Sequence, residues 1–380
     1  MAIAIGVVMM LVSFATGLGL QEKIRDKIAA FNGHINISNY DNNSSQVTLT
    51  PVDKNQEFYP EFNEVEGIAH VQAVATKFGI IRTETDFEGV IVKGVGTDYN
   101  WNYFKDFLVE GELPNVADKL NDEILISSYL ANRLQLNVGD KIPTYFLRDG
   151  SERPLTRGFV ITGIYDSGFM EFDKLYVLAD IRHIQRLNRW EENQVGNFEV
   201  FLNDFNEIDK KGQEVYENTG SFLDTQTITQ TYYSIFEWLA LFDFNIALII
   251  GIMILVAGIN MITALLVLIL ERTQMIGILK ALGGNDWSIR KIFLYNAGYL
   301  IIKGLFWGNS IGLGLLLLQK YFKLVPLDPS TYYVTEVPVY LNWDYILAVN
   351  LGTLVLCMLM LIIPSIIISK ISPSRAIKFE

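Results

Sequence analysis

The fold is decided first by residues 245–270, which read NIALIIGIMILVAGINMITALLVLIL and contain no charged side chain. An α-helix rises about 1.5 Å per residue, so roughly 20 apolar residues cross the hydrocarbon core of a bilayer. Each backbone amide and carbonyl in that core needs a partner within the protein, and a helix supplies one. The stretch therefore predicts a membrane-spanning helix.

Three further stretches have the same character. Residues 2–20 and 345–369 carry no charge, and residues 294–318 carry only Lys303. Lys303 is expected near the cytoplasmic end of its span, where a long side chain reaches the headgroups. The sequence thus predicts an α-helical membrane protein with four transmembrane helices, at residues 1–20, 241–270, 292–319 and 343–369.

The first of these stretches could instead be a signal peptide. It lacks a basic leading region, and no small-x-small cleavage motif follows it. The sequence runs directly into residues 21–25, QEKIR, as an amphipathic continuation. These features favour an uncleaved span, and a further segment upstream of Met1 stays open.

Charge separates the chain into two parts. The formal net charge is −12, of which residues 241–380 carry +3 and residues 1–240 carry −15. An acidic module argues against nucleic acid as a partner, because binding phosphates requires Lys and Arg. The single cysteine, Cys357, lies within a predicted span, so the acidic module has no disulfide.

Loop charges predict the orientation. The loop at residues 271–291 and the tail at residues 370–380 each carry +2, and positive loops remain in the cytoplasm. Residues 21–240 and 320–342 then lie outside. We expect a multi-pass protein of the bacterial inner membrane, with a large periplasmic domain inserted between the first and second spans.

The inserted domain is predicted to be α+β, with two subdomains. Apolar and polar residues alternate in residues 35–50, as in a strand. Shorter strand-like runs occur at residues 90–92, 158–162, 174–177 and 198–202. Helical spacing occurs at residues 122–134, 180–187 and 204–219.

No catalytic constellation is visible in the sequence. There is no phosphate-binding G-x-x-x-x-G-K-[ST] loop, no G-x-S-x-G elbow and no H-E-x-x-H pair. His34, His70 and His183 are far apart and lack metal-ligand spacing. We therefore predict no enzyme activity, no metal site and no cofactor bound by this chain itself.

Two features of the spans concern helix packing. Gly304, Gly308 and Gly312 recur at four-residue steps in the third span, so they share one helix face where another backbone can approach closely. Pro364 removes a backbone hydrogen bond near the end of the fourth span and is expected to kink it.

The most informative segment follows the second span. Residues 271–284 read ERTQMIGILKALGG, in which Ile276, Leu279 and Leu282 recur at helical spacing and the two glycines end the helix. The apolar side of a short helix in the cytoplasm is expected to be covered by another surface. It could lie on the membrane surface or dock into a groove of a partner, and the residues alone leave both alternatives open.

This segment closely resembles the Glu-Arg-x-x-Glu-Ile-Gly-Ile-Leu-Arg/Lys-Ala-Leu-Gly pattern of FtsX-like permeases, the membrane subunits of type VII ABC transporters. The resemblance implies a coupling helix that sits in a cleft of a separate ATPase subunit, which binds the ATP and Mg. Met275 departs from the acidic residue common in the pattern, which removes one salt bridge but leaves the docking. The implied coupling residues are Glu271, Arg272, Met275, Ile276, Gly277, Ile278, Leu279, Lys280, Ala281, Leu282 and Gly283.

The resemblance extends along the chain. The order of spans and domain matches the family, and residues 371–380 are similar to its closing Pro-x-x-Ala-Leu-Arg-x-Glu. Residues 3–37 are similar to the start of lipoprotein-releasing permeases of the LolC/LolE type, and residues 132–141 to their Leu-x-Leu-x-Val-Gly-Asp turn. A protruding loop follows that turn in LolC-type subunits and recruits a periplasmic chaperone. Here the matching loop is short, and its candidate residues are Arg148, Asp149, Gly150, Arg153 and Pro154.

The resemblance implies ATP-driven release of lipoproteins from the membrane. The implied partners are a LolD-like ATPase subunit, a second permease subunit that is a copy or a paralogue, a lipoprotein, membrane lipid and a LolA-like chaperone. Two other functions fit the same topology. They are a MacB-like efflux permease that transmits mechanical movement and an FtsX-like regulator of a periplasmic hydrolase.

Overall fold

The computed structural model describes all residues except 44, 117–118, 148–152 and 371–380. The chain divides into two compact units. The first, here called the helical unit, comprises residues 1–22, 237–327 and 336–380. The second, here called the α/β unit, comprises residues 23–236 and 328–335.

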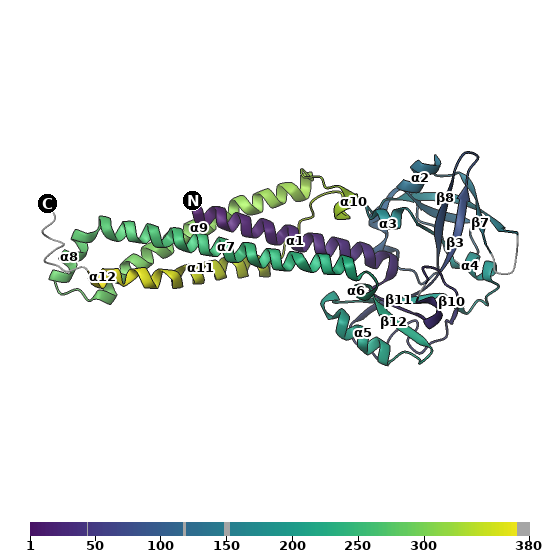
Figure 1. Cartoon of the computed structure of the whole chain (residues 1–380), viewed down its shortest axis with the longest axis horizontal. Helices are drawn as coiled ribbons and strands as arrows, with labels where there is room; N and C mark the ends of the chain where they lie inside the picture. Colours follow the sequence, from purple (N-terminus) through teal and green to yellow (C-terminus); the bar gives the residue numbers. More distant parts are fainter. Residues whose placement is uncertain (44, 117–118, 148–152, 371–380) are drawn as a thin grey trace. The chain divides into compact units, whose positions relative to one another are not determined.

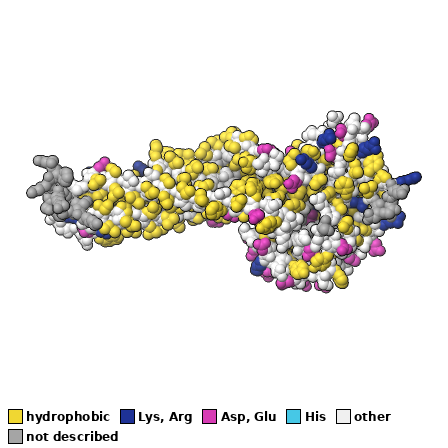
Figure 2. Space-filling view, in the orientation of Figure 1, with side chains coloured by type: hydrophobic (Ala, Val, Ile, Leu, Met, Phe, Trp, Pro, Cys, Tyr) yellow, Lys and Arg dark blue, Asp and Glu magenta, His cyan; other side chains and the backbone are white. Residues whose placement is uncertain are grey.

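In the described part of the chain, four helices are long and apolar enough to cross a membrane. They are α1 (Ala2–Asn32), α7 (Tyr233–Glu271), α9 (Asp286–Phe322) and α11 (Trp343–Ser365). Figure 1 shows them lying side by side within the helical unit. Hydrophobic side chains cover its visible face, whereas Lys, Arg, Asp and Glu gather on the α/β unit (Figure 2). The prediction of four apolar helices together with a mixed α/β domain is confirmed.

These helices continue beyond their apolar stretches. The apolar run of α1 stops at Leu20, yet the helix continues for twelve residues because one side of this part is apolar. Ile24 and Ile28 there are fully buried. Lys303, expected near one end of its span, lies near the middle of α9, with its Nζ atom 4.9 Å from the ring centroid of Tyr299.

Two short helices complete the helical unit. They are α8 (Thr273–Ala281) and α12 (Ile367–Lys370). The helix α11 stops one residue after Pro364, and α12 begins after a turn at Ile366. One polar pair joins α9 and α11, because the side-chain amides of Asn309 and Asn350 donate to each other at 2.6 and 3.0 Å.

Twelve described strands build the α/β unit. They are β1 (Ile35–Asn39), β2 (Val52–Asp53), β3 (Ile68–Arg82), β4 (Phe87–Val95), β5 (Leu108–Gly111), β6 (Glu123–Ser127), β7 (Lys141–Phe146), β8 (Leu155–Tyr165), β9 (Tyr176–Asp180), β10 (Gln194–Val195), β11 (Asn197–Leu202) and β12 (Leu223–Thr227). Ten of them form one sheet, of which nine follow the order β12-β1-β11-β3-β4-β9-β6-β8-β5, and β2 pairs only with β10. The remaining strand, β7, pairs with both β3 and β8. The strands β3, β4, β9, β6, β8 and β7 therefore close into a barrel, and β11, β1 and β12 extend from β3.

Short helices connect these strands. They are α2 (Ser128–Leu134), α3 (Met170–Asp173), α4 (Ile181–Asn188), α5 (Ile208–Glu217), α6 (Ile228–Thr231) and α10 (Pro329–Tyr332). Four 3-10 turns, η1 (Tyr40–Asn42), η2 (Trp101–Tyr103), η3 (Lys105–Phe107) and η4 (Phe205–Glu207), accompany them. Next to α10, the ring of Tyr333 stacks on Phe169 with centroids 4.6 Å apart, and Lys27 donates to the Tyr333 carbonyl at 3.0 Å.

Several predicted elements differ from the structure. The predicted helix at residues 122–134 is wrong over residues 123–127, which form β6. Ile124, Leu125 and Ile126 are all fully buried, and such a continuous apolar run does not separate a buried strand from a buried helix. The strand predicted over residues 35–50 ends at Asn39, whose side chain caps η1.

Candidate coupling sites

Local backbone features set the first and last residues of α8. Arg272 interrupts the helical path after α7, and α8 begins at the next residue. At the other end Gly283 has φ +89°, a left-handed conformation that glycine adopts without steric cost. The amide of Gly284 donates to the Leu279 carbonyl at 2.9 Å, which closes the last turn.

The two sides of α8 have different surroundings. Ile276 and Gly277 are buried, and Leu279 packs against the apolar core of the helical unit. The opposite side is exposed and apolar. It consists of Met275, Ile278 and Leu282, which are 38%, 46% and 81% exposed.

This exposed side is here called the α8 stripe. Its members are spaced by three and four residues, so they lie on one helix face. The sequence predicted one apolar face made of Ile276, Leu279 and Leu282. In the structure Ile276 and Leu279 lie on the buried side of α8, whereas Leu282 lies on the exposed side. Of the other residues implied by the resemblance, Glu271, Arg272, Ala281 and Gly283 are exposed.

Lys280 fastens α8 to the rest of the helical unit. Its side chain is 10% exposed and lies 2.9 Å from the carboxylate of Asp286 at the start of α9. Its ammonium also donates to the Ser369 carbonyl of α12 at 3.1 Å, and Arg290 donates to the Ser369 hydroxyl. The buried side of α8 is therefore held by both apolar and ionic contacts, while the stripe has no apolar cover among the described residues.

The three glycines of α9 face α1. A Cβ atom added at Gly304 would lie 2.8 Å from the Cβ atom of Ile3, and one at Gly308 would lie 2.7 Å from that of Val7. At Gly312 the nearest atom is the Cδ1 of Leu11, at 3.2 Å. Any larger residue at the first two positions would force the helices apart.

The candidate chaperone loop connects β7 to β8. These strands form a hairpin in which Phe146 pairs with Leu155. Arg148, Asp149 and Gly150 lie outside the described residues, whereas Arg153 and Pro154 are exposed. A surface cavity of about 510 Å³ adjoins the hairpin, and its lining includes Ile80, Arg82, Phe87, Tyr145, Leu147 and Pro154. Phe87 and Leu147 there are 68% and 63% exposed.

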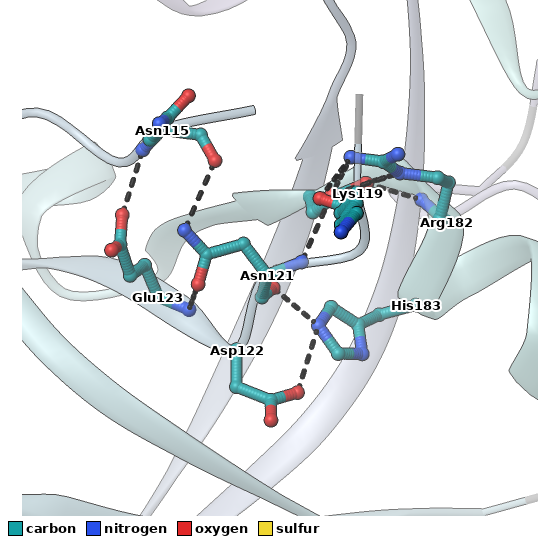
Figure 3. Close-up of polar contacts among 8 residues, drawn as sticks. Asn115, Lys119, Asn121, Asp122, Glu123, Arg182 and His183 are labelled. Atoms are coloured by element: carbon teal, nitrogen blue, oxygen red, sulfur yellow. Dashed lines mark hydrogen bonds and ion pairs between the residues drawn. The ribbon is translucent and has the colours of Figure 1, made fainter. Parts of the chain in front are cut away.

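A polar cluster surrounds His183, next to the chain segment that leads into β6 (Figure 3). The Nε2 atom of His183 lies 2.8 Å from the Asn121 carbonyl and 3.5 Å from a carboxylate oxygen of Asp122. Burial lowers the pKa of His183, so the ring is neutral at pH 7 and donates to that carbonyl. Arg182 bonds Asp180 and the Lys119 carbonyl.

These contacts hold the chain segment before β6 in place, and among the described residues the Nδ1 atom of His183 is buried without a hydrogen-bond partner. Within the described ranges, no group of three or more His, Cys, Asp or Glu side chains is arranged to hold a metal. The coupling helix, the glycine face and the hairpin therefore remain as the candidate sites.

Comparison with known proteins identifies two regions of similarity. Residues 1–215 match the family described as MacB-like periplasmic core domain, and residues 247–373 match the FtsX-like permease C-terminal family. Together they cover most of the chain.

Similar curated proteins are lipoprotein-releasing system transmembrane proteins LolC. The protein from Haemophilus influenzae is 25% identical over 285 residues, which cover 73% of this chain and 67% of that protein. Those from Xylella fastidiosa strain 9a5c and Buchnera aphidicola are 19% and 22% identical over 398 and 393 residues. Both alignments cover 100% of this chain and 92% of the relative.

Two solved structures are also similar. One is the extracellular domain of the noncanonic ABC-type transporter YknZ from Gram-positive bacteria, with a TM-score of 0.34 and 14% identity over 51% of this chain and 99% of that domain. The other is a domain of a putative permease from Porphyromonas gingivalis, with a TM-score of 0.27 and 13% identity over 50% of this chain and 85% of that domain.

Proposed function

Because this chain belongs to the permease family that joins a MacB-like periplasmic core domain to an FtsX-like C-terminal domain, we propose that it releases lipoproteins from the inner membrane, driven by a separate ATPase. The family consists of multi-pass membrane subunits of ABC transporters that are not themselves catalytic. The resemblance seen in the coupling segment is thereby confirmed at the level of the family. The cargo, the ATPase and the coupling residues belong to the proposal.

The observation that carries the proposal is the α8 stripe. A helix whose one side is fixed by Ile276 and Lys280 moves as part of the helical unit, and its other side presents Met275, Ile278 and Leu282. An apolar helix face of this kind fits a hydrophobic groove on a partner. When ATP closes the partner subunit, movement of that groove displaces α8 and the helices joined to it.

The glycine face supports transmission of that movement. The close approach of α9 to α1 at Gly304 and Gly308 lets the two helices move as one body. Since α1 continues without interruption to Asn32, its displacement reaches residues of the α/β unit. We infer that this unit lies in the periplasm, as the loop charges predict.

The names of the LolC relatives support a lipoprotein as cargo. A second permease subunit, either a copy of this chain or a paralogue, would complete the transporter. The cavity beside the β7–β8 hairpin, with Phe87 and Leu147 exposed, is the surface we assign to a LolA-like chaperone that accepts the cargo.

Purification of the full chain in detergent, followed by identification of bound proteins, tests the proposal. We expect an ABC ATPase and a lipid-anchored protein. A bound periplasmic hydrolase would favour the regulator instead, and an efflux partner without acylated cargo would favour the MacB-like alternative.

Variants of the stripe test the docking itself. Leu282→Glu places a charge in the proposed groove, and we expect the co-purified ATPase to fall about ten-fold. Ser288→Glu adds the same charge to an exposed position in the first turn of α9 and serves as the control. A photo-crosslinker at Leu282 that reaches only lipid would contradict ATPase docking at this helix.

A further inference from the structure

The carboxyl end of α1 meets side chains from the sheet of the α/β unit. The last carbonyls of a helix have no partner within it. The hydroxyl of Tyr99 donates to the Ala30 carbonyl at 3.4 Å, and the ammonium of Lys93 donates to the Phe31 carbonyl at 2.7 Å. A cation at this end also complements the helix dipole, whose negative pole lies there.

Lys93 is itself held by a buried carboxylate. Its Nζ atom lies 2.6 Å from Glu199 of β11, and the two side chains are 1% and 3% exposed. The second oxygen of Glu199 accepts from Gln72 of β3 at 2.8 Å. One connected group of hydrogen bonds therefore joins the end of α1 to three adjacent strands, β3, β4 and β11.

Stability alone is a weak explanation of this arrangement. Burial lowers the pKa of Lys93 and raises that of Glu199, and each partner's charge opposes the shift of the other. Taking both charges out of water costs free energy that an apolar pair of similar size would not require. Apolar side chains would serve stability as well, so the property that distinguishes this pair is the fixed geometry of its hydrogen bonds.

Apolar packing already holds the end of α1 in place. The ring of Phe31 lies 4.7 Å from that of Phe172, 5.1 Å from Phe104 and 5.6 Å from Tyr176, measured between centroids. Such packing stabilises the helix end, but the hydrophobic effect behind it has no preferred direction. Charge-assisted hydrogen bonds require a fixed distance and angle, and they set the position of the helix end.

We propose that Lys93, held by Glu199, is the positioning residue through which displacement of α1 reaches the sheet of the α/β unit. The inference rests on the proposed function, in which ATP binding displaces the spans. When the hydrogen bonds among Lys93, Glu199 and Gln72 are present, β3, β4 and β11 move with the helix. Without them, the helix end stays joined to β1 through residues 33–34 but no longer holds β3 and β4, and it moves against the aromatic cluster.

The test uses the full chain in lipid nanodiscs with the ATPase subunit that co-purifies with it. Lys93→Met combined with Glu199→Met removes both charges together, which avoids leaving one of them buried alone. Lys77→Met is the matched control, because Lys77 is another sheet lysine and bonds Asn188 of α4 at 2.6 Å. For each protein, ATP hydrolysis, cargo release and amide hydrogen exchange at residues 28–33 are measured with and without ATP.

We expect the double variant to hydrolyse ATP at the wild-type rate while releasing cargo about ten-fold more slowly. In the double variant, exchange at residues 28–33 should rise about ten-fold on addition of ATP, because the displaced helix end then lacks the charge-assisted hydrogen bond that holds it in the wild type. The control should match the wild type in all three measurements. A double variant that releases cargo at the wild-type rate, with exchange unchanged by ATP, would overturn the role of Lys93.

Failure of the proposed function gives a different result. If the wild-type complex hydrolyses ATP but releases no lipoprotein, the cargo is wrong. The exchange difference between the wild type and the double variant then still decides the role of Lys93.

Discussion

Two lysines of this chain perform the same chemistry in different surroundings. Lys93 bonds the Phe31 carbonyl at the end of α1 and the carboxylate of Glu199, and both side chains are almost fully buried. Lys280 bonds the Ser369 carbonyl of α12 and the carboxylate of Asp286, which is 45% exposed. In water an ion pair is screened and worth little, whereas in a protein interior an unpaired charge is expensive. Solvent therefore weakens the pair at the coupling helix through its half-exposed carboxylate, whereas the pair at the sheet is shielded from water.

The largest effect is expected from breaking the buried pair at one partner. Lys93→Met leaves the carboxylate of Glu199 buried without its cation, and the free energy of unfolding of the α/β unit should fall by about 3–5 kcal/mol. Urea denaturation of the full chain in detergent, followed by tryptophan fluorescence, measures it. The double variant with Glu199→Met should recover most of the loss. Equal losses in the single and double variants would show that the pairing is not responsible.

A buried carboxylate that is held by a hydroxyl sharpens the comparison. Asp173 is 3% exposed and accepts from the Ser167 hydroxyl at 2.6 Å. Burial raises its pKa from 3.8 to about 6. A folded-state pKa above the unfolded value adds stability below pH 3.8 that is lost as the pH rises through 6.

Asp173→Asn keeps the acceptor oxygen and removes the charge. At pH 7.5 it should raise the free energy of unfolding by up to about 3 kcal/mol, and below pH 4 it should change nothing. Denaturation at the two pH values measures the difference. A gain that is the same at both pH values would assign it to packing rather than to ionisation.

A buried histidine without a carboxylate partner gives the opposite pH dependence. The Nδ1 atom of His34 accepts from the Leu202 amide at 2.9 Å, and burial lowers its pKa from 6.5 to about 4. The stability it contributes is present above pH 6.5 and is lost as the pH falls through 4. The loss at pH 5 should be about 2 kcal/mol.

His34→Asn offers an acceptor that does not titrate. The variant therefore isolates the part of the pH dependence of stability that His34 causes. Stability of the variant should depend less on pH between 4 and 6.5 than that of the wild type. Parallel pH profiles of the two proteins would show that another group is responsible.

The smallest effect is expected at the pair of Lys280 with Asp286, whose carboxylate is 45% exposed. Lys280→Met should change the thermal midpoint by no more than about 2 °C, and the change should shrink as salt is added. Scanning calorimetry at low and high salt measures it, with Lys93→Met as the reference whose effect salt leaves largely unchanged. A large shift that is insensitive to salt would show that the Lys280 pair is shielded from solvent as well as the Lys93 pair is.

The sequence by itself determined the four apolar helices, because an uncharged stretch of that length requires a helix in a bilayer. It also determined the family, through the coupling segment and the residues at the start of the chain. The glycine period of α9 followed from its spacing as well, since three residues at four-residue steps share one helix face.

Only the tertiary structure decided which side of α8 is exposed, because Ile276 and Leu282 are equally apolar and only their surroundings differ. It also decided that residues 123–127 form a strand, since burial on both faces erases the alternation that marks a strand. The pairing of Lys93 with Glu199 joins residues more than a hundred positions apart. Lys93 and Glu199 are each a charged residue within an apolar strand, and only the folding of the sheet brings the two together.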